Sequence, residues 1–316
     1  MLLKACKTTI VIIVAIILTF FLKAMGPFKP EEMGNLFLSS FTDAKFMKLF
    51  LTGSEVVEGA CKKPERVGNV EDGGWDLCMD DIPWRGCIVY SAGTRDDASF
   101  DIGMTKKGCE VHSFDPSLSQ MVEQGYGSTD HFLKGLKKTG VNFHEYGLGG
   151  VDLSYPPGTI PWSWPGIGYG AESNDGAWEL KTLESTLQEL GHSEGITVFK
   201  ADIEGAEWAM LERMLSNSAT RQMLKSGKLV RQMLLEVHLT PRFDKSSHAA
   251  SSVRHPRSDT AVDSFNAHAM NLIKQLTDLN FVVWKHSLNT NVVINSPFGD
   301  APCCHEVSLI WRQPAE

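Results

Sequence analysis

The 316-residue chain has the composition of a folded globular protein, with 42% hydrophobic and 22% charged residues. Its 28 glycines and 14 prolines are close to average usage, which excludes collagen-like and low-complexity proteins. The formal net charge is −8, and no basic run reaches five residues. Because nucleic-acid binding depends on positive charge that neutralises phosphates, we expect no nucleic-acid partner.

An apolar segment without charges runs over residues 8–22, between Lys7 and Lys23. A helix that spans a bilayer needs roughly 17 to 25 residues, and residues 5–25 reach that length if the lysines extend toward the interfaces. We therefore expect residues 1–25 to form a cytosolic tip and a transmembrane signal anchor. The slight excess of positive charge before the segment predicts a cytosolic N-terminus and a luminal remainder, in the endoplasmic reticulum or Golgi. A cleaved signal peptide, and hence a secreted protein, is the alternative.

Residues 26–73 are expected to form a stem and linker, polar over 59–74, with regular structure beginning near Trp75. The chain has seven cysteines, and six of them follow the apolar segment. In an oxidising compartment six cysteines allow three disulfides, with fifteen possible connectivities. Buried thiols are the alternative, above all for Cys87 and Cys109, which lie beside apolar strand-like runs.

From Trp75 onward, short β-rich runs alternate with helical stretches, which is typical of βαβ units and a parallel sheet. Strands are expected over residues 87–90, 109–114, 141–146, 196–201, 233–238, 281–284 and 307–311. Helices are expected around Phe100 and Met104 and over residues 183–190, 206–215 and 265–279, with a long irregular stretch over 151–176. These elements predict one α/β domain over residues 74–316, with a doubly wound, mostly parallel sheet.

The residues after each strand are the candidates for ligand binding, because open parallel sheets bind ligands beyond the carboxyl ends of their strands. The first strand ends in Ser91-Ala92-Gly93-Thr94, a turn of small residues that lets backbone approach a ligand closely. Asp115 follows the second strand, twenty-two residues after Gly93, a spacing that suits a carboxylate on ribose hydroxyls. Leu148 follows the third strand and is expected at the same edge.

The G-x-G-x-x-G fingerprint of dinucleotide sites is absent after the first strand. Asp96 and Asp97 stand instead where the phosphates of a dinucleotide would lie. This acidity favours a positively charged adenosine ligand such as S-adenosylmethionine. A simple turn followed by an acidic helix N-terminus is the alternative interpretation.

Further acidic residues follow the fourth strand, where Asp202, Glu204 and Glu207 lie within six residues. One carboxylate would orient the ammonium group of a ligand and another would accept a proton; an acidic first helical turn is the alternative for Glu204 and Glu207. At the end of the fifth strand Glu236 and His238 alternate, so both project to the same side. A carboxylate beside an imidazole is a candidate general base, with a purely structural histidine as the alternative.

Other patterns in the sequence are weaker indications of a functional site. The irregular stretch holds aromatic residues that would stack on a flat ligand or pin the loop to its own domain, namely Tyr155, Trp162, Trp164 and Tyr169. Cys303-Cys304-His305 is too short to define a metal site, and no P-loop, nucleophile elbow or H-E-x-x-H helix occurs. We therefore expect no bound metal.

Four segments, taken in order, resemble the FkbM-type methyltransferases. These are residues 89–93 (VYSAG), 109–117 (CEVHSFDPS), 200–208 (KADIEGAEW) and 236–238 (EVH). More closely, the chain is similar to the methyltransferase-like protein 24 group, which shares the Gly74-Trp75-Asp76 start. The resemblance covers residues 73–311. It implies a class I methyltransferase fold, a seven-stranded sheet with one antiparallel strand, and methylation of a hydroxyl group with S-adenosylmethionine as cofactor.

The resemblance also implies roles for individual residues. Ser91 and Gly93 would line the methionine end of the cofactor, Asp115 would hold its ribose, and Asp202 would lie beside the sulfonium and the acceptor. The chain departs from the family where the glycine-rich motif after the first strand is reduced to Ser91-Ala92-Gly93 before an acidic pair.

Three functions are consistent with the sequence. The first is an S-adenosylmethionine-dependent O-methyltransferase of the secretory pathway, with Glu204, Glu236 and His238 as catalytic candidates and a glycan, lipid or small molecule as acceptor. The second is a membrane-anchored glycosyltransferase in which Asp202-Ile203-Glu204 holds a metal and a nucleotide sugar. The third is a binding protein that keeps the fold without the chemistry.

Overall fold

The computed structural model describes residues 56–70, 73–80, 82–95, 97–117, 129–155, 178–238, 268–269, 271–296 and 299–314. The predicted signal anchor, most of the predicted stem, Asp96 and the aromatic residues Trp162, Trp164 and Tyr169 lie outside these residues. Within the described part of the chain, no helix has the length and apolar character needed to cross a membrane.

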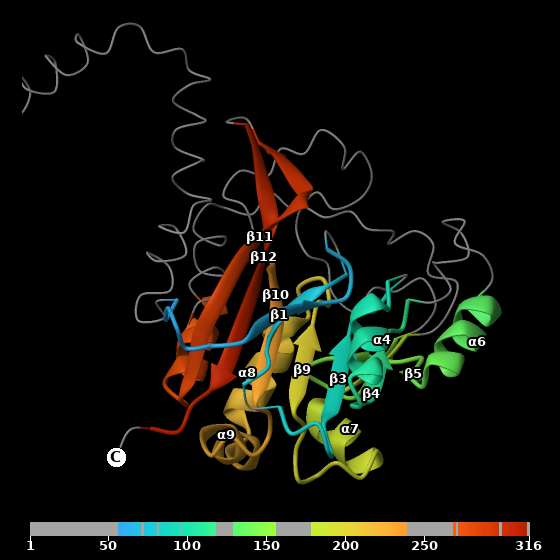
Figure 1. The fold of residues 1–316 in the computed structure, drawn as a ribbon, viewed down its shortest axis with the longest axis horizontal. Coiled ribbons are helices and arrows are strands. Elements are labelled where there is room, and N and C mark those ends of the chain that lie inside the picture. Colours follow the sequence, from blue (N-terminus) through green and yellow to red (C-terminus); the bar gives the residue numbers. More distant parts are fainter. Residues whose placement is uncertain are drawn as a thin grey trace, which may run out of the picture.

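A seven-stranded mixed sheet forms the centre of the fold, in the order β11-β12-β10-β9-β3-β4-β5 (Figure 1). Its strands are β3 (Ile88–Ala92), β4 (Glu110–Phe114), β5 (Asn142–His144), β9 (Val198–Ala201), β10 (Gln232–His238), β11 (Phe281–Ser296) and β12 (Gly299–Trp311). The pairs between β5, β4, β3, β9 and β10 are all parallel. Strand β12 is antiparallel to both of its neighbours. The sheet thus has the predicted seven strands and a single antiparallel one.

The central strands are buried on both faces, because each face carries its own layer. Tyr90 and Phe199 belong to one hydrophobic core, whereas their chain neighbours Val89 and Val198 belong to the other. A strand enclosed in this way reads as a continuous apolar run rather than an alternating one. This is why the runs over 196–201 and 233–238 identified β9 and β10 from the sequence.

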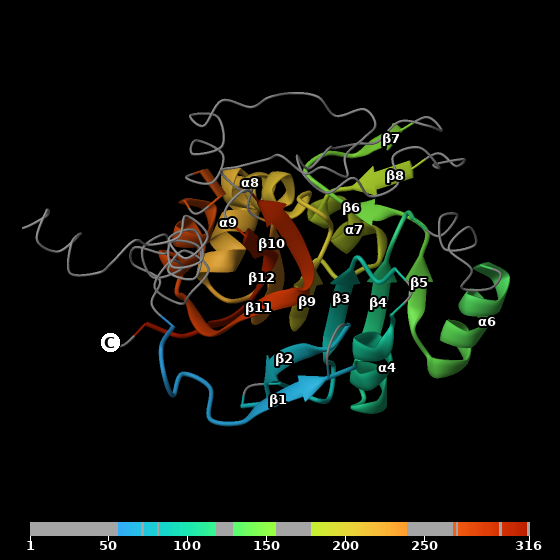
Figure 2. The ribbon, with the colours of Figure 1, turned by 90° about the horizontal axis from the view of Figure 1, so that it is seen from above.

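Helices and a hairpin form the two layers (Figure 2). One face carries α7 (Leu183–Glu189), α8 (Glu207–Ser216), α9 (Ser218–Lys225) and a helical segment over 271–277. The other carries α4 (Ser99–Lys106), α6 (Thr129–Thr139), β1 (Pro64–Val67) and β2 (Trp75–Cys78). The chain runs from β3 through α4 to β4 in one direction and from β9 through α8 and α9 to β10 in the other. The winding therefore reverses between β3 and β9, where doubly wound sheets bind their ligands.

The long hairpin β11–β12 extends past the carboxyl end of β10. His238, the last residue of β10, lies opposite Cys304, and the two hairpin strands continue pairing beyond that point to Ser296 and Gly299. Figure 1 shows the hairpin projecting beyond the edge at which the parallel strands end. Both strands are longer than the predicted runs over 281–284 and 307–311, which identified only their buried inner parts.

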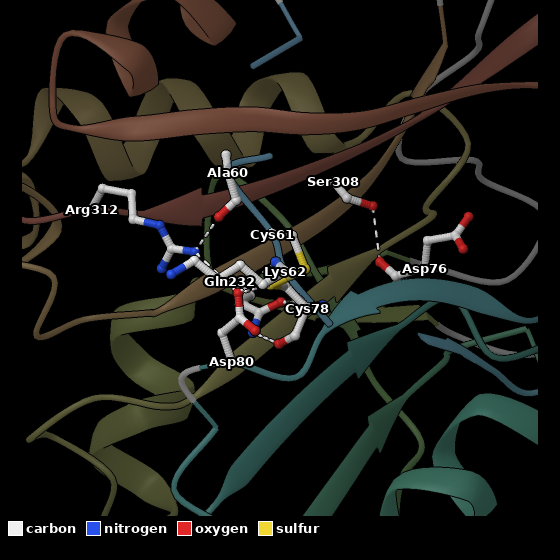
Figure 3. The surroundings of a disulfide bond; sticks show 9 residues. All are labelled: Ala60, Cys61, Lys62, Asp76, Cys78, Asp80, Gln232, Ser308 and Arg312. Carbon is white, nitrogen blue, oxygen red and sulfur yellow. Dashed lines mark hydrogen bonds and ion pairs between the residues drawn. A yellow bond between two sulfur atoms is a disulfide. The ribbon is translucent and has the colours of Figure 1, made fainter. Parts of the chain in front are cut away.

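The predicted linker over 59–74 is wrong for residues 64–67. These residues form β1, which pairs antiparallel with β2, and Val67 is buried in the core. A disulfide joins Cys61 to Cys78 at the end of β2, and Gln232 of β10 exchanges two hydrogen bonds with the backbone of Cys78 (Figure 3). Regular structure therefore begins before Trp75, while the wider division into anchor, stem and domain stays a prediction.

A second disulfide joins Cys87 and Cys109, the residues directly before β3 and β4. The alternative of two buried thiols is therefore wrong for this pair. Cys304 is also disulfide-bonded. Structural disulfides are typical of oxidising compartments and rare in the cytosol.

A small three-stranded sheet, in the order β6-β8-β7, lies beside the main one. Its strands are β6 (Gly147–Leu148), β7 (Leu153–Tyr155) and β8 (Trp178–Lys181). Strand β7 lies inside the stretch over 151–176 that the sequence predicts to be irregular, so that prediction is wrong for its first residues. Three-residue strands carry too short a pattern to be recognised before their partner is known.

Candidate functional site

At the switch point, the turn after β3 lies directly against the turn after β9. The Gly93 amide donates a hydrogen bond to the carbonyl oxygen of Phe114 (2.9 Å), and the Asp202 amide donates to that of Ala92 (3.1 Å). Gly93 has a φ of 80°, and a Cβ atom there would overlap the carbonyl oxygen of Asp202. Only glycine fits both the left-handed backbone and the close approach.

Lys200 holds these two turns together from within the sheet. Its buried ammonium donates hydrogen bonds to the carbonyl oxygens of Ala92 (3.0 Å) and Gly93 (2.6 Å), and it lies 3.9 Å from the carboxylate of Asp202. It also faces the ring of Trp75, 5.5 Å from the centroid. A lysine inside an otherwise apolar parallel strand is a sequence signal for such a role, because buried ammonium groups are rare unless paired.

Asp115 connects the end of β4 to the turn after β3. Its buried carboxylate accepts hydrogen bonds from the amides of Arg95 (2.5 Å) and Ser117 (2.7 Å). Arg95 has a left-handed φ of 45°, a conformation that this contact helps to hold. The hydroxyl of Ser117 also donates to Oδ1, so that oxygen is fully occupied. Oδ2 accepts only from Arg95 and keeps one lone pair for a ligand hydroxyl.

A buried ion pair joins the start of α8 to the end of β10. The Nδ1 atom of His238 lies 2.8 Å from Oε1 of Glu207, and both side chains are almost completely buried. The same carboxylate accepts hydrogen bonds from the backbone amides of His238 (3.2 Å) and Gly205 (2.9 Å). The indole of Trp208 donates to the carbonyl oxygen of His238 (3.0 Å). Glu207 is thus fully engaged inside the protein and unavailable to a ligand.

Carboxylates surround the imidazole of His238. Its Nε2 atom lies 3.5 Å from Glu204 and 3.6 Å from Glu236. Burial by itself lowers the pKa of His238, but the charge and hydrogen bond of Glu207, followed by Glu236 and Glu204, raise that pKa to about 10. His238 is therefore a cation at neutral pH, which is not the state of a general base.

Asp202 stays ionised, and 29% of its side chain is exposed. Burial acts to raise its pKa, but Lys200, a hydrogen bond with Glu236 and the cations of His238 and Arg95 outweigh burial and lower the pKa below its ordinary value. The carboxylate therefore presents a fixed negative charge beside Gly93.

Glu204 behaves differently from Asp202, although only two residues separate them. Partial burial raises the pKa of Glu204 to about 7. The cation of His238 opposes this shift, and the negative charges of Asp202 and Glu207 add to it. Its side chain remains 46% exposed, and its φ of 56° is unusual for a residue that is not glycine. A strained, accessible carboxylate with a pKa near neutrality is typical of a functional site.

The donor atoms of Asp202, Glu236 and His238 lie within 4.8 Å of one another, so their spacing alone would admit a metal ion. A metal would have to displace the proton of His238 and break the hydrogen bond between Asp202 and Glu236. The cations of His238 and Lys200 already lie beside these carboxylates and would repel a metal ion bound by all three groups. An organic cation that contacts only the partly exposed Asp202 fits the arrangement better.

The structure brings together Gly93, Asp202, Glu204, Glu236 and His238, as the strand-end argument predicts, with Asp115 linked to them through Arg95. Two predicted residues lie elsewhere. Ser91 is buried below the turn, where its hydroxyl interacts with the buried carboxyl group of Asp101. Leu148 in β6 is completely buried in the core, so its side chain serves packing. Their contacts with a cofactor stay predictions.

A doubly wound sheet with a crowded glycine turn at its switch point defines a Rossmann-like protein. Comparison with known proteins refines this class. A family model described as "Methyltransferase domain" matches residues 44–283, more than half of the chain. The chain therefore belongs to the methyltransferase-domain family.

Two curated relatives confirm the predicted resemblance to the methyltransferase-like protein 24 group. "Probable methyltransferase-like protein 24" from Homo sapiens is 31% identical over 189 residues, which is 57% of this chain and 42% of the relative. The Rattus norvegicus protein of the same name is 31% identical over 190 residues, or 57% of this chain and 43% of the relative. The match thus spans less than half the length of these relatives.

Among solved structures, the chain is similar to methyltransferase FkbM from Methylobacillus flagellatus KT. The TM-score is 0.35 at 12% identity, over 70% of this chain and 43% of that chain. The description of the fold accordingly rests on the strand order and register given above.

Proposed function

We propose that the protein is an S-adenosylmethionine-dependent methyltransferase that methylates a hydroxyl group. The observation that carries this proposal is the ionised carboxylate of Asp202, held beside the Gly93 turn where the winding of the sheet reverses. Membership of a methyltransferase family supports the transfer of a methyl group. The choice of cofactor and of an oxygen acceptor is the proposal itself.

The residues at this edge fit the proposed cofactor. One hydroxyl of its ribose would donate to the free acceptor position on Oδ2 of Asp115, and its cationic methionine end would face Asp202. Gly93 would supply backbone without a side chain in the way. When bound, the cofactor supplies an electrophilic methyl group; the protein's share of catalysis is alignment and removal of a proton.

Glu204 is the group best suited to take the proton that the acceptor hydroxyl loses. Its pKa of about 7 keeps a large ionised fraction at neutral pH while making it a stronger base than an ordinary carboxylate. The His238 cation, 3.5 Å away, positions the Glu204 carboxylate, and Glu207 in turn fixes His238. Glu236 holds Asp202 through a hydrogen bond in which Glu236 carries the proton and donates it, because Asp202 is ionised. Of the three predicted catalytic residues, Glu204 thus becomes the base, and Glu236 and His238 become positioning residues.

The two disulfides Cys61–Cys78 and Cys87–Cys109 support a location in the secretory pathway or outside the cell. We propose that the catalytic part faces the lumen behind the predicted N-terminal anchor and modifies a glycan, lipid or small molecule. Because the family is one of methyltransferases, we do not retain the glycosyltransferase alternative.

A thermal-shift screen of the full chain tests this function. The ligands are S-adenosylmethionine, its demethylated product S-adenosylhomocysteine, and the uridine and guanosine diphosphate sugars with manganese. A ligand at a hundred times its dissociation constant stabilises a protein by about 2.7 kcal/mol, or roughly 5 to 10 °C for a domain of this size. We expect that shift with the two adenosine compounds alone. A shift with nucleotide sugars, or none with S-adenosylmethionine, would contradict the proposal.

Transfer itself is tested by incubating the protein with methyl-labelled S-adenosylmethionine and glycan or lipid fractions of secretory membranes. Glu204→Gln should bind the cofactor normally and transfer label more slowly. Normal binding without transfer by the unsubstituted protein, to any fraction, would favour the non-catalytic alternative.

A further inference from the structure

Three side chains with metal-binding atoms meet at the amino end of β4, at the opposite end of that strand from Asp115. Glu110 is the first residue of β4, His112 follows two residues later, and His192 lies in the turn after α7. A carboxylate oxygen of Glu110 lies 2.9 Å from Nε2 of His112 and 3.5 Å from Nε2 of His192. One donor atom from each of the three residues lies within 4.8 Å of the others.

The other nitrogen of each imidazole is held by a neighbouring side chain. Nδ1 of His112 lies 2.9 Å from Nε2 of His144, the last residue of β5. Nδ1 of His192 lies 2.9 Å from the hydroxyl of Tyr90 in β3. Both rings are therefore oriented with Nε2 toward Glu110. Histidines that bind metals have this arrangement, in which the second nitrogen donates a hydrogen bond that fixes the tautomer and the ring plane.

Two of the three separations between the proposed ligand atoms are close to those of tetrahedral zinc. Bonds of about 2.0 to 2.1 Å in a tetrahedron place neighbouring ligand atoms about 3.3 Å apart. The two separations from the Glu110 oxygen, 2.9 and 3.5 Å, lie on either side of that value. Two imidazole nitrogens and one carboxylate oxygen are also ligands that zinc accepts.

The burial of the three side chains suits a metal site. The side chains of His112 and His192 are largely buried, which fixes their positions, whereas that of Glu110 is 52% exposed. The exposed side gives an ion a route to the site and leaves a fourth coordination position to water.

We propose that Glu110, His112 and His192 bind one Zn²⁺ ion, with His144 and Tyr90 as positioning residues. Zinc binding moves the ring proton of His112 from Nε2, where it lies against Glu110, to Nδ1, where it is donated to Nε2 of His144. The ion then takes the freed lone pair of Nε2, and the neutral imidazole releases no net proton. The bound ion joins the start of β4 to the segment between α7 and β9. The site is separate from the groups proposed for methyl transfer, because none of the three ligands lies at the carboxyl edge of the sheet; only the positioning residue His144, at the end of β5, reaches that edge.

Titration of the full chain, produced without a histidine tag and stripped with a chelator, tests this site. The probes are Zn²⁺ alone, followed by calorimetry, and Co²⁺ alone, followed by the visible absorption of a tetrahedral complex. We expect one equivalent of either ion to bind. Glu110→Gln and His112→Ala should abolish this binding, and His144→Gln should weaken it roughly 10- to 100-fold.

Two controls accompany this titration. His268→Ala removes an exposed histidine that lies 3.7 Å from Glu212, and it should bind zinc as the unsubstituted protein does. Glu110→Gln alters an exposed side chain and preserves its shape, so circular dichroism should show an intact fold. Absence of zinc binding by the unsubstituted protein would overturn the proposal, and so would equal binding by Glu110→Gln and His112→Ala. Loss of binding in His268→Ala would do the same.

Discussion

Replacing Glu207 with glutamine removes the negative charge that faces His238 while preserving the shape of the side chain. The Glu207 carboxylate is completely buried and accepts hydrogen bonds from the His238 ring, the His238 backbone and Gly205. A glutamine keeps one acceptor oxygen, but its amide nitrogen only donates. The buried imidazolium would then lose its nearest counter-charge, because Glu204 and Glu236 lie farther away.

The size of this effect follows from the pKa of His238. A rise from 6.5 to about 10 corresponds to roughly 5 kcal/mol of preferential interaction with the charged ring, at 1.36 kcal/mol for each tenfold change. This figure is net of burial, which acts in the opposite direction, and Glu236 and Glu204 share the favourable part with Glu207, so it does not isolate the contribution of Glu207. Removing one partner of a buried ion pair typically costs about 3 to 5 kcal/mol. We expect Glu207→Gln to lower the free energy of unfolding by about 3 kcal/mol at pH 7.

The same pair predicts a pH dependence. A histidine whose pKa is raised in the folded state contributes its full stabilisation below its unfolded pKa, and this contribution is lost as pH rises through the folded pKa. The unsubstituted protein should therefore lose stability between about pH 6.5 and pH 10, and Glu207→Gln should lose less over that range.

Urea denaturation followed by circular dichroism, at several pH values from 6 to 9, measures both effects. Glu212→Gln is the matched control, because Glu212 lies on the same helix with 62% of its side chain exposed. The control should change stability by less than about 0.5 kcal/mol. If Glu207→Gln unfolded at the same urea concentration as the control throughout this range, the buried ion pair would not stabilise the fold and the reasoning would be refuted.

Three further predictions follow from the site and the disulfides. Gly93→Ala should cost at least about 1 to 3 kcal/mol from backbone strain alone, in addition to the overlap with the Asp202 carbonyl, and an unchanged melting temperature would be incompatible with the tight turn. Replacing Cys61 and Cys78 by serine opens a loop spanning 17 residues and should lower stability by about 3 kcal/mol under oxidising conditions; equal stability would show that this bond is absent or without effect. The carboxyl carbon of Glu204, assigned by its disappearance in Glu204→Gln, should titrate by NMR near pH 7. A midpoint near the ordinary 4.5 would remove Glu204 as the base.

Much of the fold was predictable because buried parallel strands read as unbroken apolar runs that end at small or acidic residues. The runs at 196–201 and 233–238 show this directly, since both faces of β9 and β10 are covered. The sequence did not indicate β1 or α9, for two different reasons. Strand β1 is stabilised by pairing with β2, which lies in another part of the chain. Helix α9 buries only Thr220 and Leu224, which are too few residues to set a recognisable period.

The candidate site was predictable in its location and not in its charges. That acids after β9 and β10 share one edge follows from parallel pairing alone. Which acid faces which base depends on contacts across the fold. The pairing of Glu207 with His238, which lie 31 residues apart in the chain, turns an apparent base into a cation. It thereby leaves Glu204, two residues after Asp202, as the carboxylate with a pKa near neutrality.

The central claim is that an ionised Asp202 at the switch point binds S-adenosylmethionine. Calorimetric titration of the cofactor into the full chain and into Asp202→Asn tests it most directly, with Glu212→Gln as the control. We expect one site per chain in the unsubstituted protein and in the control. Loss of a hydrogen bond to a charged group is worth about 1.5 to 3 kcal/mol, so binding by Asp202→Asn should be roughly 10- to 100-fold weaker. Equal affinity in Asp202→Asn, or no binding by the unsubstituted protein, would contradict the account.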